Sequence, residues 1–451
     1  MQLLFGGVCC KFLRRILYMK TFQPKLFTSL KNYNGHKLVN DIIAGIIVAI
    51  IALPLSIALA IASGATPAQG LYTAAVAGFV IAFLGGSNVN ISGPTAAFAT
   101  IVAGVIASSG FEGLVIATVM AGIILIVLGL CRAGSLIRFM PHTITVGFTS
   151  GVAVTILIGQ IKDFLGLDFR GAKPVEAGEK LIEIIKNIST VNLSALAVGA
   201  IGLCILVVWN VLAAKTKGKI SFVFTKIPAS IIAVIIGVVI VMFTPLKSAT
   251  IGTLYPDLTS GFPKFSFPSL SVGTVVNVIP DAFAIAILAA IESLLSCVVS
   301  DKMIGDKHNS NTELIAQGAG NICSGLFGGI PATGAIARTA ANVKNGGRSP
   351  VAGVVHAVVI LLFLVVLMPV AKLIPMPIIA AILFIVAYNM SEWREFVAIC
   401  KKKRLGDIAV LLVTFTLTVV LNLVVAIIAG IVVTLLFYVA HKIKAKKENN
   451  N

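Results

Sequence analysis

Charged residues are scarce in this sequence. Asp, Glu, Lys and Arg make up 12% of the 451 residues, whereas hydrophobic residues make up 58%. Soluble domains carry about twice that charged fraction. Because no single soluble core needs so much apolar surface, the composition excludes an ordinary soluble domain. It predicts a protein that crosses the lipid bilayer repeatedly.

Signatures of enzymes and of metal sites are absent from the sequence as well. The seven cysteines show no metal-ligand spacing, and most lie in or beside apolar runs, where a free cysteine behaves as a small hydrophobe. There is no HExxH or Gly-x-Ser-x-Gly motif and no pair of intramembrane aspartates. We therefore expect neither an enzyme nor a protein with a bound metal or cofactor.

The positive charges lie in a few short clusters. The net charge of +18 is by itself compatible with nucleic-acid binding. However, long uncharged runs separate the clusters and no basic face with interleaved aromatic residues occurs, so we expect no nucleic-acid partner. Clusters of this kind are typical of the cytoplasmic loops of membrane proteins. They lie at Lys11–Lys37, Lys215–Lys226, Lys401–Arg404 and Lys442–Lys447.

The first residues do not form a good signal peptide. Their apolar part, Leu3–Cys10, precedes Lys11 instead of following the positive charges, and no small-residue cleavage site follows. Met19 gives a more natural start, so we expect residues 1–18 to come from an upstream start codon.

Apolar runs of about 20 residues match the thickness of a bilayer and predict fourteen helices. The third, ninth and tenth are too short to cross about 30 Å of hydrocarbon alone. With the N-terminus inside, every even-numbered helix ends at a segment with Lys or Arg. Both termini are therefore expected in the cytoplasm, at a bacterial-type inner (plasma) membrane. The predicted helices cover residues 42–63, 71–86, 94–108, 112–131, 143–164, 192–213, 228–245, 280–299, 311–327, 335–345, 351–370, 376–390, 406–421 and 424–441.

The predicted helices divide the chain into two halves. Because each half holds seven helices, an odd number, the second half is inverted relative to the first, which is a common plan of transporters. The expected fold is an all-α polytopic membrane protein with a seven-plus-seven inverted repeat. Its parts are a cytoplasmic segment at 1–41, the first repeat at 42–245, an outside connector at 246–279, the second repeat at 280–441 and a basic tail at 442–451.

Two stretches interrupt apolar helices with similar sequences. Ile91–Thr100 is ISGPTAAFAT and Ile330–Thr339 is IPATGAIART. Each follows a Gly-Gly pair and carries a Pro shortly before a Thr, and the two stretches belong to the third and tenth predicted helices, which are equivalent positions. Matched short interruptions are the best sequence pointer to a transporter site. The alternative is that Pro and Gly merely kink packed helices.

A helix that begins inside the membrane favours an anion at its start. Its first backbone N–H groups have no intrahelical partners, and the helix dipole adds a partial positive charge there. Two such starts that face each other therefore predict an anion site. The small residues Ala96, Ala97, Gly334 and Ala335 would let an anion approach the backbone closely.

Two ionisable residues accompany the interrupted stretches. Arg338 lies about one turn past Gly334 and would add a full positive charge; the alternative is an arginine that snorkels to the membrane surface. Glu292 is the lone carboxylate of the eighth predicted helix. Desolvation favours its protonated form, so it would carry a coupled proton. The alternatives for Glu292 are a hydrogen-bonded structural carboxylate and a cation ligand.

Four motifs occur together in the sequence: ISGPT, VGFTSG, NSNTELIAQG and FGGIPATGAIART, at Ile91–Thr95, Val146–Gly151, Asn309–Gly318 and Phe327–Thr339. With these motifs the sequence resembles the SulP family of anion permeases, from about residue 22 to residue 441.

The resemblance implies a seven-plus-seven fold shared with nucleobase permeases. Helices 1–4 and 8–11 would form a core that shifts like an elevator against a gate of helices 5–7 and 12–14, usually within a homodimer. The anion would lie between the starts of helices three and ten, facing helices one and eight. By motif position the resemblance assigns the site to Gly93, Pro94, Thr95, Thr333, Gly334, Ala335, Arg338 and Leu55, with Glu292 at the acidic position of helix eight.

The sequence departs from the family pattern at two places. Leu55 follows Pro54, where many members have Gln, and this makes the site more like those of bacterial dicarboxylate and bicarbonate members. The usual cytoplasmic STAS domain is not expected, because nothing after Lys442 is long enough to fold.

The sequence thus predicts a secondary transporter of small anions of the sulfate, bicarbonate or C4-dicarboxylate class. The resemblance implies H⁺ or Na⁺ symport, or anion exchange. A passive anion channel on the same fold and a nucleobase:cation symporter are the alternatives. A nucleobase site would need aromatic and amide groups, whereas this site offers Thr, Gly, Ala and Arg.

Overall fold

The computed structural model describes most of the chain. The predictions made for residues 1–18, for the basic cluster at 217–226 and for the last tail residues lie outside the described residues. The described residues are 22–31, 33–135, 141–171, 174–216, 227–258, 260–269, 271–402, 404–421 and 423–448.

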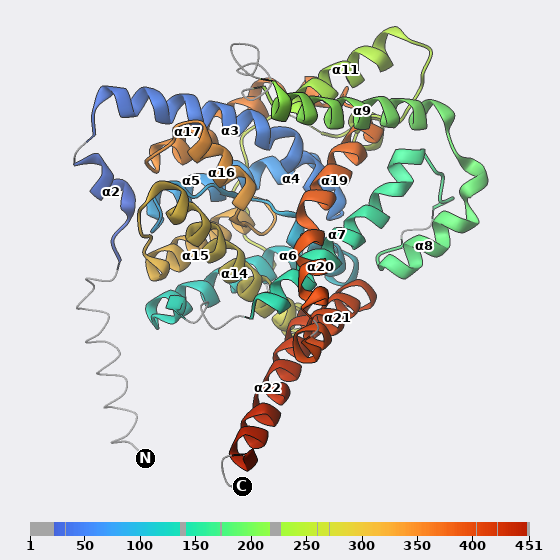
Figure 1. Ribbon diagram of the computed structural model, residues 1–451. Helices are drawn as coiled ribbons and strands as arrows, with labels where there is room; N and C mark the ends of the chain where they lie inside the picture. Colours follow the sequence, from blue (N-terminus) through green and yellow to red (C-terminus); the bar gives the residue numbers. More distant parts are fainter. Residues whose placement is uncertain are drawn as a thin grey trace.

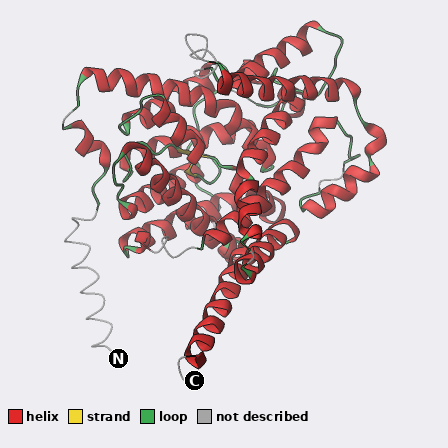
Figure 2. Cartoon of the chain, viewed as in Figure 1, coloured by secondary structure: helices red, strands yellow, loops and turns green. Residues whose placement is uncertain are grey.

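Helices make up nearly all of the regular structure that is described (Figure 2). The helices of the first half are α2 (Lys25–Leu30), α3 (Gly35–Ala62), α4 (Pro67–Tyr72), α5 (Gly78–Leu84), α6 (Ala99–Leu130), α7 (His142–Leu165), α8 (Ala177–Lys186), α9 (Leu193–Lys215) and α11 (Ala229–Phe243). A π-helical turn, Thr73–Ala77, joins α4 to α5, and 3₁₀ turns lie at Ala96–Phe98 and Ile188–Thr190.

The connector and the second half continue in the same way. The short helices α12 (Ile251–Leu254) and α13 (Val272–Asn277) lie in the connector. They are followed by α14 (Ile279–Ile304), α15 (Ser310–Leu326), α16 (Ile336–Lys344), α17 (Val351–Val366), α18 (Met368–Ala371), α19 (Met376–Met390), α20 (Trp393–Lys401), α21 (Leu405–Val420) and α22 (Leu423–Glu448). The two strands are β1 (Ser92–Gly93) and β2 (Thr333–Gly334).

Most predicted helices begin and end within a few residues of observed ones, because long apolar runs and end signals define both. Two details differ from the prediction. The third and fourth predicted helices lie within one long helix, α6, although Gly110 interrupts it with φ 68° and ψ −176°. The third does not begin at Pro94: Ser92–Gly93 is extended, and helical turns begin only at Ala96. At the break in α6 a glycine is well suited, since residues other than glycine rarely adopt the positive φ of Gly110.

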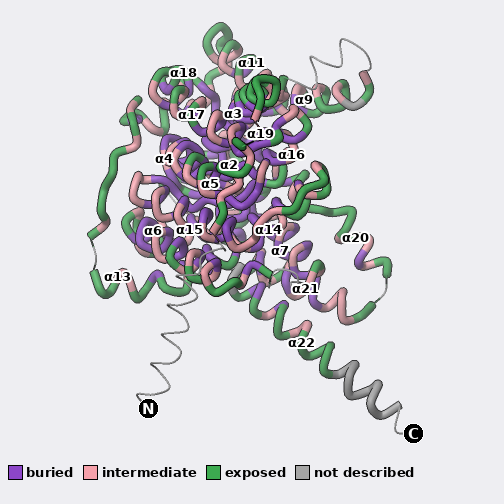
Figure 3. Tube along the Cα trace, turned by 90° about the vertical axis from the view of Figure 1, so that its left-hand side faces the viewer, coloured by how far each residue is buried: buried purple, intermediate pink, exposed green. Residues whose placement is uncertain are grey.

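Within the described residues, seven helical stretches are long and apolar enough to cross a membrane. Large exposed hydrophobic side chains are frequent on α9, α11 and α22, whereas the buried residues gather in the middle of the molecule (Figure 3). The spans are Gly35–Ala62, Pro67–Leu84, Ala96–Leu130, His142–Leu165, Leu193–Ala213, Ile279–Ile304 and Met376–Lys401; shorter apolar helices lie at Ala229–Phe243, Val351–Val366, Leu405–Val420 and Val425–Val439.

The helices pack in two groups (Figure 1). In the first group, α15 packs along α6 and α5, α17 packs along α3 and α5, and α14 packs against α6 and α16. In the second group, α7 packs against α19 and α21, α9 packs against α11 and α19, and α22 packs along α21. The groups meet mainly where α3 contacts α19 and α11 and where α6 contacts α7.

Candidate functional site

The two interrupted stretches lie side by side as a pair of antiparallel strands. Ser92 of β1 is opposite Gly334 of β2, and Gly93 is opposite Thr333. The Ala335 N–H extends the pairing by donating to the Ile91 carbonyl at 2.9 Å. The strands end where Pro94, which has no N–H to donate, follows β1. Segments about 240 residues apart in the sequence therefore meet in the middle of the first helix group.

Gly334 is needed for the close approach of these segments. A Cβ on this residue would lie 2.7 Å from Asn90 Nδ2 and 3.1 Å from the Cα of Ser293. The space beside β2 is therefore filled by α14 and by the polypeptide just before β1.

A helical segment begins directly after each strand. A 3₁₀ turn starts at Ala96 and continues into α6, and α16 starts at Ile336. Thr95 and Ala335 occupy the N-cap positions, both in extended conformation, and neither side chain caps its helix. The two helix starts therefore keep the donor groups and the partial positive charge that favour an anion.

Side chains of α14 contact both helix starts. Thr95 Oγ1 donates to Glu292 Oε2 at 2.9 Å, and both residues are half-buried. The next residue, Ser293, shares a hydrogen bond with Thr333, with 2.7 Å between the two hydroxyl oxygens. The Ser293 hydroxyl oxygen also accepts a hydrogen bond from the Gly334 N–H at 3.2 Å. One turn of α14 thus brings Glu292 to the first stretch and Ser293 to the second.

Arg338 lies behind β1, and its side chain is 1% exposed. Nη2 donates to the Pro94 carbonyl. A Cβ on Gly93 would lie 2.5 Å from Nη1, so only a glycine leaves room for the guanidinium. Within the described part of the chain, Nε and Nη1 have no hydrogen-bond partner, and no carboxylate forms an ion pair with Arg338. A buried charge with free donors favours a ligand of opposite charge.

The structure places the remaining predicted residues as follows. Gly93, Pro94, Thr333, Gly334 and Ala335 are all buried at the strand pair. Leu55 lies on α3, half-buried, and packs against the main apolar core. Its assignment to the site therefore stays a prediction that rests on the family resemblance alone.

A buried polar network beside β1 did not follow from the sequence reasoning. Glu313 accepts hydrogen bonds from Asn90 Nδ2 at 2.8 Å and Gln317 Nε2 at 3.0 Å, and Gln317 also donates to Ser92 Oγ at 2.9 Å. Asn321 donates to the Ala332 carbonyl and accepts from its N–H, both at 2.9 Å. The sequence does carry one sign of this network: the polar residues 313, 317 and 321 recur every four positions and so share one helix face.

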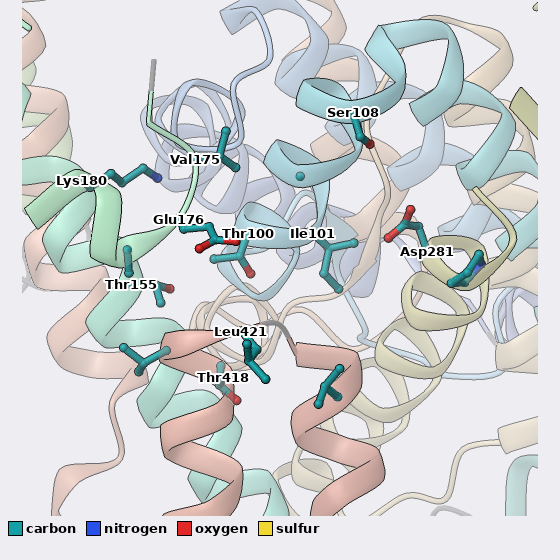
Figure 4. A pocket seen from close by; sticks show the side chains of 15 residues that line it. Thr100, Ile101, Ser108, Thr155, Val175, Glu176, Lys180, Asp281, Thr418 and Leu421 are labelled. Atoms are coloured by element: carbon teal, nitrogen blue, oxygen red, sulfur yellow. The ribbon is translucent and has the colours of Figure 1, made fainter. Parts of the chain in front are cut away.

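A cavity of about 440 Å³ lies between the two helix groups (Figure 4). Thr100, Gly104 and Ser108 line it from one face of α6, while Thr155 of α7 faces them from the second group. None of the predicted site residues lines the cavity, and Thr100, five residues after Thr95, is the lining residue nearest to them in sequence.

Charged groups line the same cavity. Glu176 and Lys180 come from α8 and the residue before it, and Asp281 comes from the first turn of α14. Burial lowers the pKa of the Lys180 ammonium, and the neighbouring Glu179 charge opposes this effect. Both groups of helices therefore contribute charge to the space between them.

Residues 38–414 match the sulfate permease family. The chain belongs to this family. Its named relatives are transporters, and none of those described below is an enzyme. This sulfate permease family member is accordingly a multi-pass membrane protein of a transporter family.

Two relatives show how far the similarity to other members of the sulfate permease family extends. YvdB of Bacillus subtilis (strain 168), whose name gives a provisional assignment as a sulfate transporter, is 43% identical over 93% of this chain and 77% of its own length. The bicarbonate transporter BicA of Picosynechococcus sp. (strain ATCC 27264 / PCC 7002 / PR-6) is 33% identical over 87% of this chain and 69% of its own.

Solved structures show the same fold. The transmembrane domain of a cyanobacterial bicarbonate transporter BicA superposes with a TM-score of 0.73 and 28% identity, over 88% of this chain and 98% of that domain. The murine anion transporter Slc26a9 in an inward-facing state superposes with a TM-score of 0.84, over 93% of this chain and 71% of that one. At 20% identity the second likeness shows the fold alone.

Proposed function

We propose that this protein is a secondary active transporter of small anions, with sulfate and bicarbonate as the first candidate substrates. The observation that carries the proposal is the pairing of β1 with β2, which sets two helix starts side by side within the membrane-spanning part of the fold. Membership of a family with sulfate and bicarbonate transporters supports this substrate class.

The anion is proposed to bind at the helix starts after Pro94 and Gly334. There the backbone N–H groups and the two helix dipoles act on it together. Arg338 contributes a buried positive charge from behind β1. The Thr95 hydroxyl donates to Glu292, and it becomes free to donate to the anion when a protonated Glu292 donates to it instead. The small residues at both starts leave the backbone accessible to the ligand.

Glu292 is proposed to couple transport to a cation, most simply a proton. Its carboxylate shares a hydrogen bond with Thr95, so the coupling group contacts the anion site directly. Protonation of a half-buried carboxylate removes a negative charge beside the anion, and the two ions therefore favour each other's binding. Sodium at the same carboxylate would act by the same electrostatic principle.

The two groups of helices are proposed to be the core and the gate of an elevator-like transporter. Under this proposal α3–α6 and α14–α17 carry the site and move as a body against α7, α9, α11, α19, α21 and α22. The fourteen-span inverted repeat and a homodimer are parts of the same proposal. The cavity between Thr100 and Thr155 supports it, because it lies between residues of the two groups.

Uptake into proteoliposomes tests the proposed function. Labelled sulfate, bicarbonate and a C4-dicarboxylate are offered across imposed H⁺ and Na⁺ gradients, with empty liposomes as the control. We expect saturable uptake of one of these anions that an imposed gradient accelerates. Unitary currents in planar bilayers would assign a channel instead, and the absence of anion flux would contradict the proposal.

A further inference from the structure

Glu313 of α15 is a buried carboxylate, 1% exposed, that has no role in the transport scheme above. Its Oε2 accepts a hydrogen bond from the Gly86 N–H at 2.9 Å, and its Oε1 accepts from Asn90 Nδ2 at 2.8 Å and Gln317 Nε2 at 3.0 Å. All three donors are N–H groups, so the carboxyl group acts only as an acceptor. This is the hydrogen-bonding pattern of an ionised carboxylate.

The same hydrogen bonds connect Glu313 to both interrupted stretches. Through Gln317 the network reaches Ser92 of β1. Through Asn90 it reaches Thr339 of α16, whose hydroxyl donates to Asn90 Oδ1 at 3.0 Å and accepts the Ile91 N–H at 3.0 Å. Thr339 follows Arg338 directly, so Glu313 lies two hydrogen bonds from the helix that carries the buried cation.

Glu313 and Arg338 are buried charges of opposite sign around one strand. Neither forms an ion pair within the described residues, where the ion pairs are Lys25–Asp306, Glu183–Lys186 and Asp301–His308. Backbone and amide dipoles separate the two charges instead. A site of two helix starts and an arginine would bind anions tightly, whereas a transporter must also release them.

We propose that Glu313 is a fixed counter-charge to Arg338 that limits how tightly the site holds its anion. The inference rests on the proposed function, since it concerns the affinity of the same site. The negative charge opposes the anion and is held at a constant place by its three donors. Glu313 is thus a positioning and affinity-setting residue that does not itself touch the ligand.

The variant Glu313→Gln removes the negative charge of residue 313 and leaves the shape of its side chain almost unchanged, so it tests whether the charge sets the affinity. Its remaining oxygen still accepts from Asn90 and Gln317, and only the bond from Gly86 is lost. In proteoliposomes we expect the KM for anion uptake to fall by roughly tenfold to twentyfold, because the lost unit charge lies on the order of 10 Å from the anion and acts through an effective dielectric constant of about 20. The maximal rate falls as well, since release becomes slower. A merely structural role would raise KM instead.

Two further variants separate charge from packing. The double variant Glu313→Gln with Gln317→Glu moves the carboxylate by one helical turn, and we expect it to restore KM towards the wild-type value. Glu395→Gln removes an exposed carboxylate on α20 and is expected to leave KM unchanged. Size-exclusion chromatography confirms that each protein is monodisperse before uptake is measured.

The outcomes distinguish this inference from the proposed function. If the wild-type protein shows no anion uptake, the proposed function is overturned, and this inference with it. Normal wild-type uptake combined with an unchanged or raised KM in Glu313→Gln overturns the counter-charge alone. If that variant is not recovered as folded protein, Gln317→Lys replaces it. Its ammonium would donate to Glu313 and Ser92, the present partners of Gln317, and would compensate the negative charge of Glu313. KM is then expected to fall, and an unchanged KM would contradict the inference.

Discussion

Arg338 brings a full positive charge to the place where two helical segments begin. Replacing it with alanine is expected to weaken anion binding about 10- to 100-fold, the usual effect of losing a charge-assisted interaction in a buried site. Isothermal titration calorimetry of the purified protein with sulfate and bicarbonate measures the change. Arg394→Ala, an exposed arginine on α20, is the control. Undiminished affinity in Arg338→Ala would remove this residue from the site.

Glu292 supplies the second prediction at the residue scale. In Glu292→Gln the side chain keeps its shape and its reach to Thr95 but no longer takes up a proton. We expect uptake to become insensitive to an imposed pH gradient, while anion affinity stays within about twofold of that of the wild type with Glu292 protonated. Uptake rates at several external pH values test this. A pH dependence equal to that of the wild type would exclude Glu292 as the coupling group.

Single residues also show where the sequence reasoning stopped. It found Thr95 and Glu292 as separate candidates, and the structure shows that they share a hydrogen bond. Glu313, Asn90 and Gln317 were missed, although two of them lie in a motif that carried the family resemblance. The four-residue spacing of Glu313 and Gln317 marks one polar helix face, but only the fold shows that Asn90, from a distant segment, joins them in one network.

At the scale of elements, α6 and α15 make contact through glycines. A Cβ on Gly122 would lie 2.6 Å from the Gly318 carbonyl oxygen and 2.7 Å from Ile322 Cγ1. Gly122→Leu therefore forces the helices apart, and we expect the thermal midpoint of the detergent-solubilised protein to fall by several degrees. Gly104→Ala on the same helix is the matched control, since its Cβ would meet nothing within 4 Å. Equal midpoints for both variants would contradict the close contact.

The helix α2 is held to the loop after α14 by a salt bridge of 3.2 Å between Lys25 and Asp306. Burial acts to raise the pKa of Asp306, but hydrogen bonds from Lys307, Lys25 and Asn88, with the Lys25 charge, outweigh it and lower the pKa. A carboxylate with a lowered folded-state pKa stabilises the fold above its ordinary pKa, and this contribution is lost as the pH falls through the lowered value.

Asp306→Asn is therefore expected to lower the thermal midpoint slightly at pH 7 and to have no effect well below pH 4. The shift at pH 7 stays small, because the pair is partly exposed and solvent screens it. Thermal denaturation at the two pH values measures the difference. An equal shift at both would show that the charge of Asp306 is not responsible.

Elements differed in how well the sequence predicted them. Helix ends such as Pro375 and Gly166 carry their own signals, and the predicted boundaries there agreed within two residues. The predicted helix 280–299, in contrast, ended five residues before α14 does, because the glycine signal at Gly305 was not used. The strands β1 and β2 are two residues long and pair across about 240 positions, so no local period marks them. Their similarity to each other predicted a shared function, but not a direct backbone contact.

At the scale of the whole molecule, the cavity between the helix groups supplies a prediction. Ser108→Trp would place a large ring in the space that faces Thr155, and movement of the first group towards the second would then be obstructed. We expect the maximal uptake rate to fall at least about tenfold while anion affinity by calorimetry changes little. An unaltered rate would contradict movement of the two groups at this surface. Leu193→Trp, at the exposed start of α9, is the control.

The arrangement of the whole molecule followed from the sequence only with the help of the family. Apolar periodicity predicted the helices and their order, and matched interruptions predicted a symmetric plan. Which helices pack together depends on small residues such as Gly122 and on side-chain shape, and neither is visible in hydropathy. The family resemblance supplied the expectation of a core and a gate, which the two observed groups of helices now support as a proposal.

The pairing of β1 with β2 also makes the two halves of the chain dependent on each other during folding. Until both halves are made, each strand has an unpaired edge, and such an edge is costly away from water. A ribosome that has completed only the first 245 residues has therefore built half of a site that cannot yet close. The strand pair of the site therefore cannot form before residues 333–334 of the second half have been made.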